Sequence, residues 1–277
     1  MSVRIVTDST SDLPKELAEE LGITVVPLNV HFGLDTFQDG VDLSADQFYH
    51  RLLTSPILPK TSAPSPGLFK YHYDRLAGEG HDIISVHISS KLSGTYEAAL
   101  AGKKSMPNGC HIETFDSKAA TMGVGLLAVA AARAARSGAA FNEVVELVRK
   151  SIDGIHMVCA LDTLDFLQKG GRVGKAQAWL GSILSIKPII SMEEGEVVPL
   201  ERVRTYGKAL ARAKELIGKH LPARELAVVY STDAEEGRKM VDYVKTVSAQ
   251  QQVCLARFGP VLGTYVGPNS LAFVSLD

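Results

Sequence analysis

The chain has 277 residues, more than one hydrophobic core usually serves, so two domains are expected. Hydrophobic residues make up 45% and charged residues 22%, which excludes a mainly disordered chain. The 29 basic and 31 acidic residues give a formal charge of −2, without the basic excess that is typical of nucleic-acid-binding proteins.

The first half alternates strand and helix patterns, which predicts a mostly parallel sheet covered by helices on both faces. The expected strands are Val3–Thr7, Ile23–Val30, Asp82–Ile88 and His111–Phe115. The expected helices run from Pro14 to Leu21, from a Ser44/Gln47 capping box through Leu52, from the Ser65-Pro66 start, over Gly94–Lys103 and over Ala119–Arg136.

The pattern changes near Gly154, where we place a domain boundary between residues 1–153 and 154–277. The second domain is predicted to be mixed α+β, with a hairpin turning at Glu194-Gly195. Its other expected strands are Ile155–Leu161, Ala227–Ser231, Val253–Arg257 and Leu271–Leu276. Its expected helices are Tyr206–His220 and Glu235–Val247.

The cellular compartment is inferred from three sequence signals that we do not find: a secretion signal, a membrane span and a CxxC pair. Met1 runs directly into a strand pattern, so no secretion signal is expected, and no apolar stretch reaches the roughly 18 residues of a membrane span. The three cysteines form no CxxC pair, which favours a reducing compartment. We expect a cytoplasmic protein with no metal, no cofactor and no membrane span.

Three loops rich in hydroxyl groups suggest where a ligand binds. They are Thr7–Ser11, Thr61–Pro66 and Ser89–Thr95. The first and third follow strands and precede helices, so they should meet at the carboxyl edge of the sheet, where helix N-termini favour an anion. Each hydroxyl also has the simpler interpretation of a helix cap or turn former.

The nature of the anion is narrowed by exclusion. No Walker, Rossmann or GxSxG motif occurs, and no clustered Cys, His and Asp residues indicate a metal. His87 is interpreted as a core or surface residue.

The small residues of Gly123–Ala135 either pack closely on a sheet or leave a channel for a chain-like ligand. Burying a long acyl chain would gain on the order of 10 kcal/mol gross.

The chain resembles the DegV family of bacterial fatty-acid-binding proteins along essentially its whole length. The resemblance rests on six segments in order. They are Ile5–Pro14, Thr61–Pro66, Ser89–Tyr96, Lys169–Arg172, Lys187-Pro188 and Gly259–Pro268. Each segment is weak alone, but together they are specific.

The resemblance implies two α/β domains with a fatty acid in a tunnel between them. It implies that the carboxylate is held by Thr61 and Ser93, with Ser62, Gly94 and Thr95 nearby, and that this chain has no catalytic residues of its own. A separate fatty acid kinase would phosphorylate the bound carboxylate for phospholipid synthesis. Tyr265 stands where the family has a histidine; we expect it near the carboxylate, where its hydroxyl can donate but carries no charge.

The basic loop has two interpretations. Lys169, Arg172 and Lys175 form either a solvated surface loop or a docking face for the kinase, which Arg202 and Arg204 would extend.

Two other functions compete with the carrier. One is a phosphotransferase or hydrolase using the Ser93 and Asp8 loops, and the other is a lipid-responsive regulatory module. Acyl-chain length and oligomeric state do not follow from the sequence.

Overall fold

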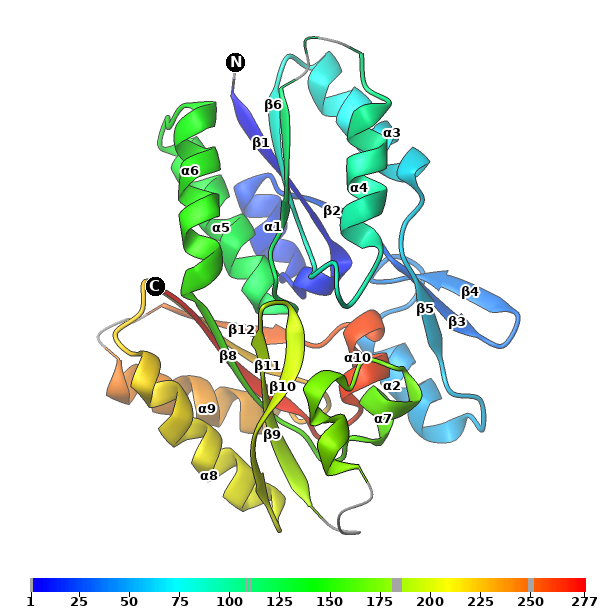
Figure 1. Cartoon of the computed structure of the whole chain (residues 1–277), viewed down its shortest axis with the longest axis vertical. Coiled ribbons are helices and arrows are strands. Elements are labelled where there is room, and N and C mark those ends of the chain that lie inside the picture. Colours follow the sequence, from blue (N-terminus) through cyan, green and yellow to red (C-terminus); the bar gives the residue numbers. More distant parts are fainter. Residues whose placement is uncertain (1, 108, 110, 181–185, 249–251) are drawn as a thin grey trace.

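Three sheets organise the computed structural model, which is described for residues 2–107, 109, 111–180, 186–248 and 252–277. The first sheet is parallel, in the order β2-β1-β6-β7. Its strands are β1 (Val3–Asp8), β2 (Thr24–Val26), β6 (Asp82–His87) and β7 (Ile112–Asp116). Both faces of this sheet are covered by helices (Figure 1), so its strands are apolar on both sides.

The second sheet is mixed, in the order β10-β9-β8-β13-β11-β12, with only the last pair parallel. Its strands are β8 (Ile155–Ala160), β9 (Lys187–Glu193), β10 (Glu196–Val203), β11 (Glu225–Tyr230), β12 (Val253–Arg257) and β13 (Leu271–Leu276). The predicted hairpin at Glu194-Gly195 is confirmed, with a positive φ at both residues.

A small antiparallel sheet, in the order β4-β3-β5, was not predicted. It contains β3 (Asn29–Phe32), β4 (Asp35–Gln38) and β5 (Lys60–Ser62). The prediction of one strand over Ile23–Val30 is wrong, because the segment divides between β2 and β3, in two different sheets. Pro27 lies at the division, and a proline cannot donate to the ladder of an uninterrupted strand.

The helices build layers around the two large sheets. They are α1 (Lys15–Leu21), α2 (Ala45–Thr54), α3 (Pro66–Gly78), α4 (Thr95–Lys104), α5 (Met122–Arg136), α6 (Phe141–Ser151), α7 (Asp165–Lys169), α8 (Tyr206–Ile217), α9 (Ala234–Val247) and α10 (Pro260–Val266). Short 3₁₀ turns are η1 (Ser9–Ser11), η2 (Ile152–Gly154), η3 (Gly174–Trp179) and η4 (Gly218–His220). The capping box at Ser44 and the Ser65-Pro66 start are confirmed. The helices α6, α7 and α10 were not predicted.

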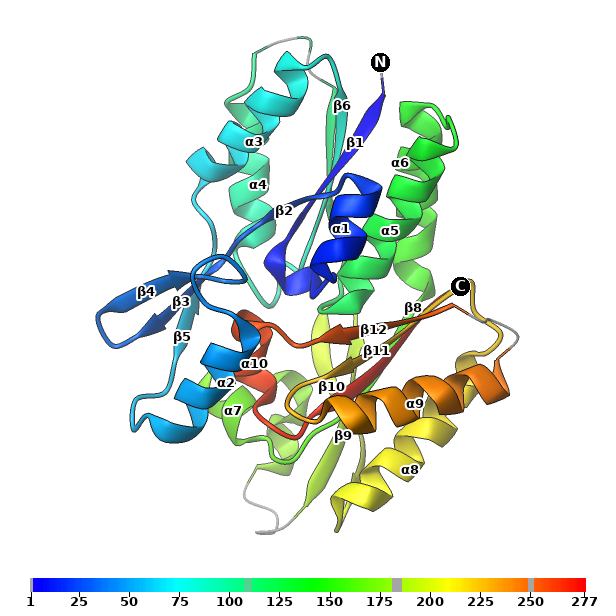
Figure 2. The same cartoon turned by 180° about the vertical axis from the view of Figure 1, so that it is seen from behind.

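The core forms on both sides of each large sheet. In β1, Val6 packs with α3 and α4, whereas Ile5 faces the cluster around α5. That cluster continues onto the second sheet through Cys159 and Val274, so α5 lies between the two sheets. The far face of the second sheet packs against α8 and α9, as Figure 2 also shows. Within the described ranges, no helix combines the length and the apolar character needed to cross a bilayer.

The two halves of the chain meet at α10. A fourth cluster joins the small sheet and α2, through Phe48 and Leu52, to Val261 of α10. The two large sheets come from residues before 117 and after 154. The domain boundary near residue 153 stays a prediction, because α10 packs against segments from the first half.

The end of α10 makes a specific demand on residue 267. Gly267 has φ 71° and ψ −174°, a backbone conformation that is essentially restricted to glycine, and a Cβ there would collide with the ring of Phe166. We expect Gly267→Ala to lower the free energy of unfolding by about 2–5 kcal/mol, combining the strain of this backbone conformation with overpacking. Urea unfolding measures the loss.

Gly207→Ala is the matched control, because Gly207 lies within α8 and a Cβ there would have no neighbour within 4 Å. This control should be as stable as the unsubstituted protein or slightly more stable, since Gly207 lies in the first turn of α8 and alanine is the better helix former. Equal stability of Gly267→Ala and the unsubstituted protein would contradict the conformational argument.

Candidate functional site

An apolar cavity lies between loops that follow the strands of the first sheet, β5 of the small sheet and the second large sheet. Its volume is about 130 Å³, about ten times the space of at least about 10–15 Å³ that one water needs. Leu28, Ile88 and Leu92 line it from the first half of the chain. Met157, Ile190, Met192, Phe258 and Leu262 line it from the second half. A cavity with these walls suits an apolar ligand.

Hydroxyl groups gather in the same cavity. Thr61 lies on β5 and Tyr265 on α10, and their hydroxyl oxygens are 2.5 Å apart although the residues are 204 positions apart in sequence. Ser93 also lines the cavity, and its Oγ lies 2.8 Å from Oγ1 of Thr95. Each hydroxyl has one proton. Each pair uses one proton internally, so each retains one to donate to a ligand.

The start of α4 adds backbone donors beside Ser93. Gly94 is the N-cap residue of α4 and lines the cavity. The first amide groups of any helix have no acceptor within the helix, and they carry a partial positive charge. Two hydroxyl protons and a helix start therefore lie at the polar part of an otherwise apolar cavity. An anionic head group on an apolar chain matches this arrangement.

Ser62 also lines the cavity, but its hydroxyl is engaged elsewhere. Its Oγ lies 2.9 Å from Nε2 of His31 and accepts a hydrogen bond from Asn29. Successive side chains of a strand point to opposite faces, so Thr61 and Ser62 cannot both direct their hydroxyls toward Tyr265.

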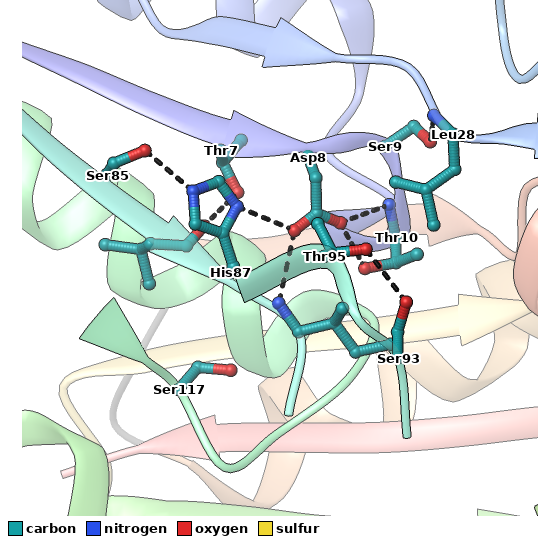
Figure 3. Close-up of polar contacts among 12 residues, drawn as sticks. Thr7, Asp8, Ser9, Thr10, Leu28, Ser85, His87, Ser93, Thr95 and Ser117 are labelled. Atoms are coloured by element: carbon teal, nitrogen blue, oxygen red, sulfur yellow. Dashed lines mark hydrogen bonds and ion pairs between the residues drawn. The ribbon is translucent and has the colours of Figure 1, made fainter. Parts of the chain in front are cut away.

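Asp8 organises the loop after β1 (Figure 3). Its carboxylate is fully buried and accepts hydrogen bonds from the backbone N–H and hydroxyl of Thr10 and from the N–H of Ile88. Nδ1 of His87 lies 2.9 Å from its Oδ2. Since Thr10 and Ile88 both line the cavity, Asp8 fixes part of the cavity wall without lining it.

His87 belongs to a buried chain of hydrogen bonds, which confirms its interpretation as a core residue. Tyr73 donates to Ser85 at 2.8 Å, and Ser85 Oγ lies 2.7 Å from His87 Nε2. Ser85, His87 and Asp8 have the residue types of a catalytic triad. All three side chains are fully buried, however, and the Ser85 hydroxyl is already bonded to Tyr73 and His87. This series of buried hydrogen bonds therefore supports the loop structurally.

The alanine-rich helix α5 packs closely against its neighbours. None of its residues lines the cavity, whose nearest residues are Ala120 and Thr121, just before the helix. A Cβ on Gly125 would lie 2.8 Å from the carbonyl oxygen of Ser11, so the small residues allow close approach. Of the two interpretations of this segment, these contacts favour close packing.

Arg172 contributes to the cavity in a way that the sequence did not indicate. Its Nε donates to the carbonyl of Leu92 at 3.1 Å, and its guanidinium lies 5.4 Å from the centre of the Tyr265 ring. It lines the apolar cavity and also an outer pocket that contains Lys60, Lys169 and Tyr265. Arg172 thus lies between the hydroxyl groups and the solvent.

The other basic residues lie outside the cavity. Lys175 is exposed on η3, which packs against β10, and Arg202 is exposed on β10 with its guanidinium 5.9 Å from the centre of the Trp179 ring. These two residues are candidates for a docking surface rather than for ligand contact.

Contacts between the halves also form at the β9–β10 turn, beside Met192 of the cavity wall. The Ser89 hydroxyl donates to the Gly195 carbonyl at 2.7 Å, and Lys118 pairs with Glu194 at 2.8 Å. The Cys159 thiol also lines the cavity, and burial raises its pKa to about 12, so it is a neutral, apolar wall residue at physiological pH. Long-range contacts of this kind leave no motif in the sequence.

Comparisons with known proteins agree along the whole chain. The family model described as "Uncharacterised protein, DegV family" matches residues 2–277. A DegV domain-containing protein of Halalkalibacterium halodurans is 37% identical, covering 97% of this chain and 96% of its own length. Protein DegV of Bacillus subtilis is 34% identical, covering 98% of each chain.

Solved structures share the fold. A crystal structure described as DegV, a fatty acid binding protein from Bacillus subtilis, has a TM-score of 0.91 at 31% identity, covering 100% of this chain and 99% of that one. A stearic-acid-binding protein from Eubacterium ventriosum has a TM-score of 0.93 at 26% identity, covering 99% and 98%. The predicted α/β class, with a parallel sheet and a separate mixed sheet, is confirmed.

Proposed function

Because the chain belongs to the DegV family, we propose that it is a non-catalytic cytoplasmic carrier of one long-chain fatty acid. The carboxylate would lie among the hydroxyls of Thr61, Ser93, Thr95 and Tyr265 and the start of α4, and the acyl chain in the apolar cavity. The observation that carries this proposal is one cavity that combines apolar walls from both halves of the chain with paired hydroxyls.

The energetic balance supports an acyl ligand. Each buried methylene contributes about 0.8 kcal/mol, so the chain supplies most of the affinity. Each hydrogen bond to the carboxylate adds about 1.5–3 kcal/mol and fixes the direction in which the ligand enters. Arg172 lies beside Tyr265 and supplies the positive charge that a tyrosine lacks.

The proposal is tested by mass spectrometry of an organic extract of the purified protein, calibrated against protein concentration. A fatty acid in near-stoichiometric amount is the expected result, and it would also identify the preferred chain. Absence of lipid, together with no uptake of added fatty acid, would contradict the carrier role. Turnover of ATP or of an ester by the chain alone would contradict its non-catalytic character.

We further propose that the carrier presents its ligand to a separate fatty acid kinase, which docks on the face formed by η3 and β10. Arg172 lines both the cavity and the outer basic pocket and lies two residues before η3, which supports this orientation. The ligand carboxylate would then be the phosphoryl acceptor, at the end of the cavity nearest the kinase.

Reversing the charges of Lys175 and Arg202 tests the docking face. We expect the double variant Lys175→Glu/Arg202→Glu to bind fatty acid as before but to be phosphorylated about tenfold more slowly at low salt, because charges at the rim of an interface mainly affect association rates. The assay follows acyl phosphate formation with the kinase subunit. The defect should shrink as ionic strength rises.

Lys245→Glu is the matched control, since Lys245 is exposed on α9, which packs against β11 and β12 at the opposite edge of the second sheet from β10. A rate equal to that of the unsubstituted protein is expected for this control. Equal rates for the double variant and the control would exclude the proposed docking face.

A further inference from the structure

Two buried carboxylates hold α10 against the first half of the chain. Asp12 follows η1, and its Oδ1 accepts the backbone N–H of Gly259 at 2.8 Å, while its Oδ2 accepts the Thr121 hydroxyl at 2.7 Å. Asp39 follows β4 and accepts hydrogen bonds from the Ser9 hydroxyl and the Val261 N–H. Both acids therefore bind the first residues of the segment that contains α10.

The two acids lie on the same side of Gly259. Oδ1 of Asp12 and Oδ1 of Asp39 each lie 3.2 Å from the position that a Cβ on Gly259 would occupy. Asp12 and Asp39 are only 8% and 5% exposed, so both are largely removed from solvent. Among the described residues, Oδ2 of Asp39 has no hydrogen-bond partner. Two carboxylates in one buried space do not both ionise readily, so they tend to retain a proton.

The surrounding charges do not neutralise the pair. Asp8 adds a further negative charge to both acids. Tyr49 donates its hydroxyl to the Phe258 carbonyl, and Arg257 pairs with exposed Asp46 while also facing Tyr49. Lys15 and Glu19, at the rim of the adjoining pocket, face each other 3.8 Å apart. A metal ion is a poor alternative, since no group of three His, Cys, Asp or Glu side chains in the described ranges is arranged to hold one.

We propose that a proton retained by the Asp12–Asp39 pair fastens α10 to the first half of the chain, and that loss of this proton loosens α10. The helix contributes Val261, Leu262, Tyr265 and Val266 to the cavity wall, so loosening it opens the wall at the polar end. The pair is a pH-sensitive latch at the junction of the two halves, and this property does not depend on which ligand the cavity holds.

The direction of the pH effect follows from burial. Burial raises the pKa of Asp39 to about 7 and raises the pKa of Asp12 well above its ordinary value. When α10 detaches and the acids are solvated, their pKa values return to about 3.9. The attached state therefore binds more protons between about pH 4 and 7. The fastening is strongest at the lower end of this window and is lost as pH rises through the folded-state value.

Hydrogen exchange of the α10 amides tests the proposal. We expect the protection factors of this segment, corrected for intrinsic exchange, to fall as pH rises from 5 to 7, by about tenfold per pH unit for each proton that opening releases. In Asp39→Asn only Asp12 of the pair can still ionise, so the fall in protection over this range should become shallower. The amides of α9, which is remote from the pair, serve as an internal reference.

Asp35→Asn is the matched control, because Asp35 is an exposed acid on β4 in the same hairpin. It should keep the pH dependence of the unsubstituted protein. A pH-independent α10, or the same pH dependence in Asp39→Asn, would overturn the proposal. If Asp39→Asn does not fold, carboxyl ¹³C NMR of the unsubstituted protein decides. An upper apparent pKa near 7 for the pair supports the latch, and two values below 5 exclude it.

Discussion

Replacing Thr61 and Ser93 together by alanine is expected to weaken fatty-acid affinity by a hundredfold or more. Each hydrogen bond to a charged group is worth about 1.5–3 kcal/mol, and about 1.4 kcal/mol corresponds to a factor of ten in affinity. Each hydroxyl pair retains one proton for the ligand, so the two substitutions affect both pairs. The acyl chain still fills the apolar cavity, so binding should be weakened but not abolished.

The single variants should each lose about tenfold, because Tyr265 and Thr95 keep their own hydroxyl protons and partly replace the missing groups. Affinity is measured by titrating delipidated protein with a labelled fatty acid, and circular dichroism checks that the fold is retained. Ser62→Ala is the matched control, since the Ser62 hydroxyl contacts His31 and Asn29. Unchanged affinity in the double variant would show that the head group binds elsewhere.

Replacing Asp8 by alanine is expected to lower the free energy of unfolding by about 3–5 kcal/mol, the range seen when one partner of a buried polar pair is removed. The substitution leaves His87 Nδ1 and the backbone N–H groups of Thr10 and Ile88 without their acceptor inside the protein. Each such unsatisfied donor is costly because water cannot reach it. Urea unfolding followed by circular dichroism measures the change.

Asp233→Ala is the matched control for Asp8→Ala. Asp233 is also an aspartate N-cap, accepting the backbone N–H of Glu236 at the start of α9, but this bond is solvent-exposed. Removing an exposed cap should cost only about 1 kcal/mol. Similar losses in the two variants would mean that Asp8 acts as an ordinary cap and that its buried contacts add nothing.

The sequence predicts the repetitive part of the fold well. Strands such as Val3–Thr7 are apolar on both faces and alternate with helices, and this local pattern is enough to imply a parallel sheet. The small sheet was not predictable in the same way. Its β5 strand has only three residues, and it pairs with β3, about 30 positions earlier in the sequence. The strand β3 is itself separated from β2 only by Pro27 and Leu28.

The candidate site was predictable where it depends on topology. Loops that follow parallel strands meet at one edge, so the order of strands and helices along the chain is enough to place the Asp8 and Ser93 loops together. Contacts that depend on long-range packing could not be predicted in this way. The pairing of Tyr265 with Thr61, the position of Arg172 over the Tyr265 ring and the walls from β8 and β9 all join distant segments. The Asp12–Asp39 pair belongs to the same class.

The position of α10 has a consequence for how the molecule would tolerate being divided. A protease cut or a gene split at residue 153 would separate α10 from α2, from the small sheet and from Asp12 and Asp39. The C-terminal fragment would then carry a helix with its apolar side uncovered, and the N-terminal fragment would expose Phe48 and two uncompensated acids. The halves are therefore interdependent folding units, and reassembly of complementary fragments should be favoured over independent folding of either one.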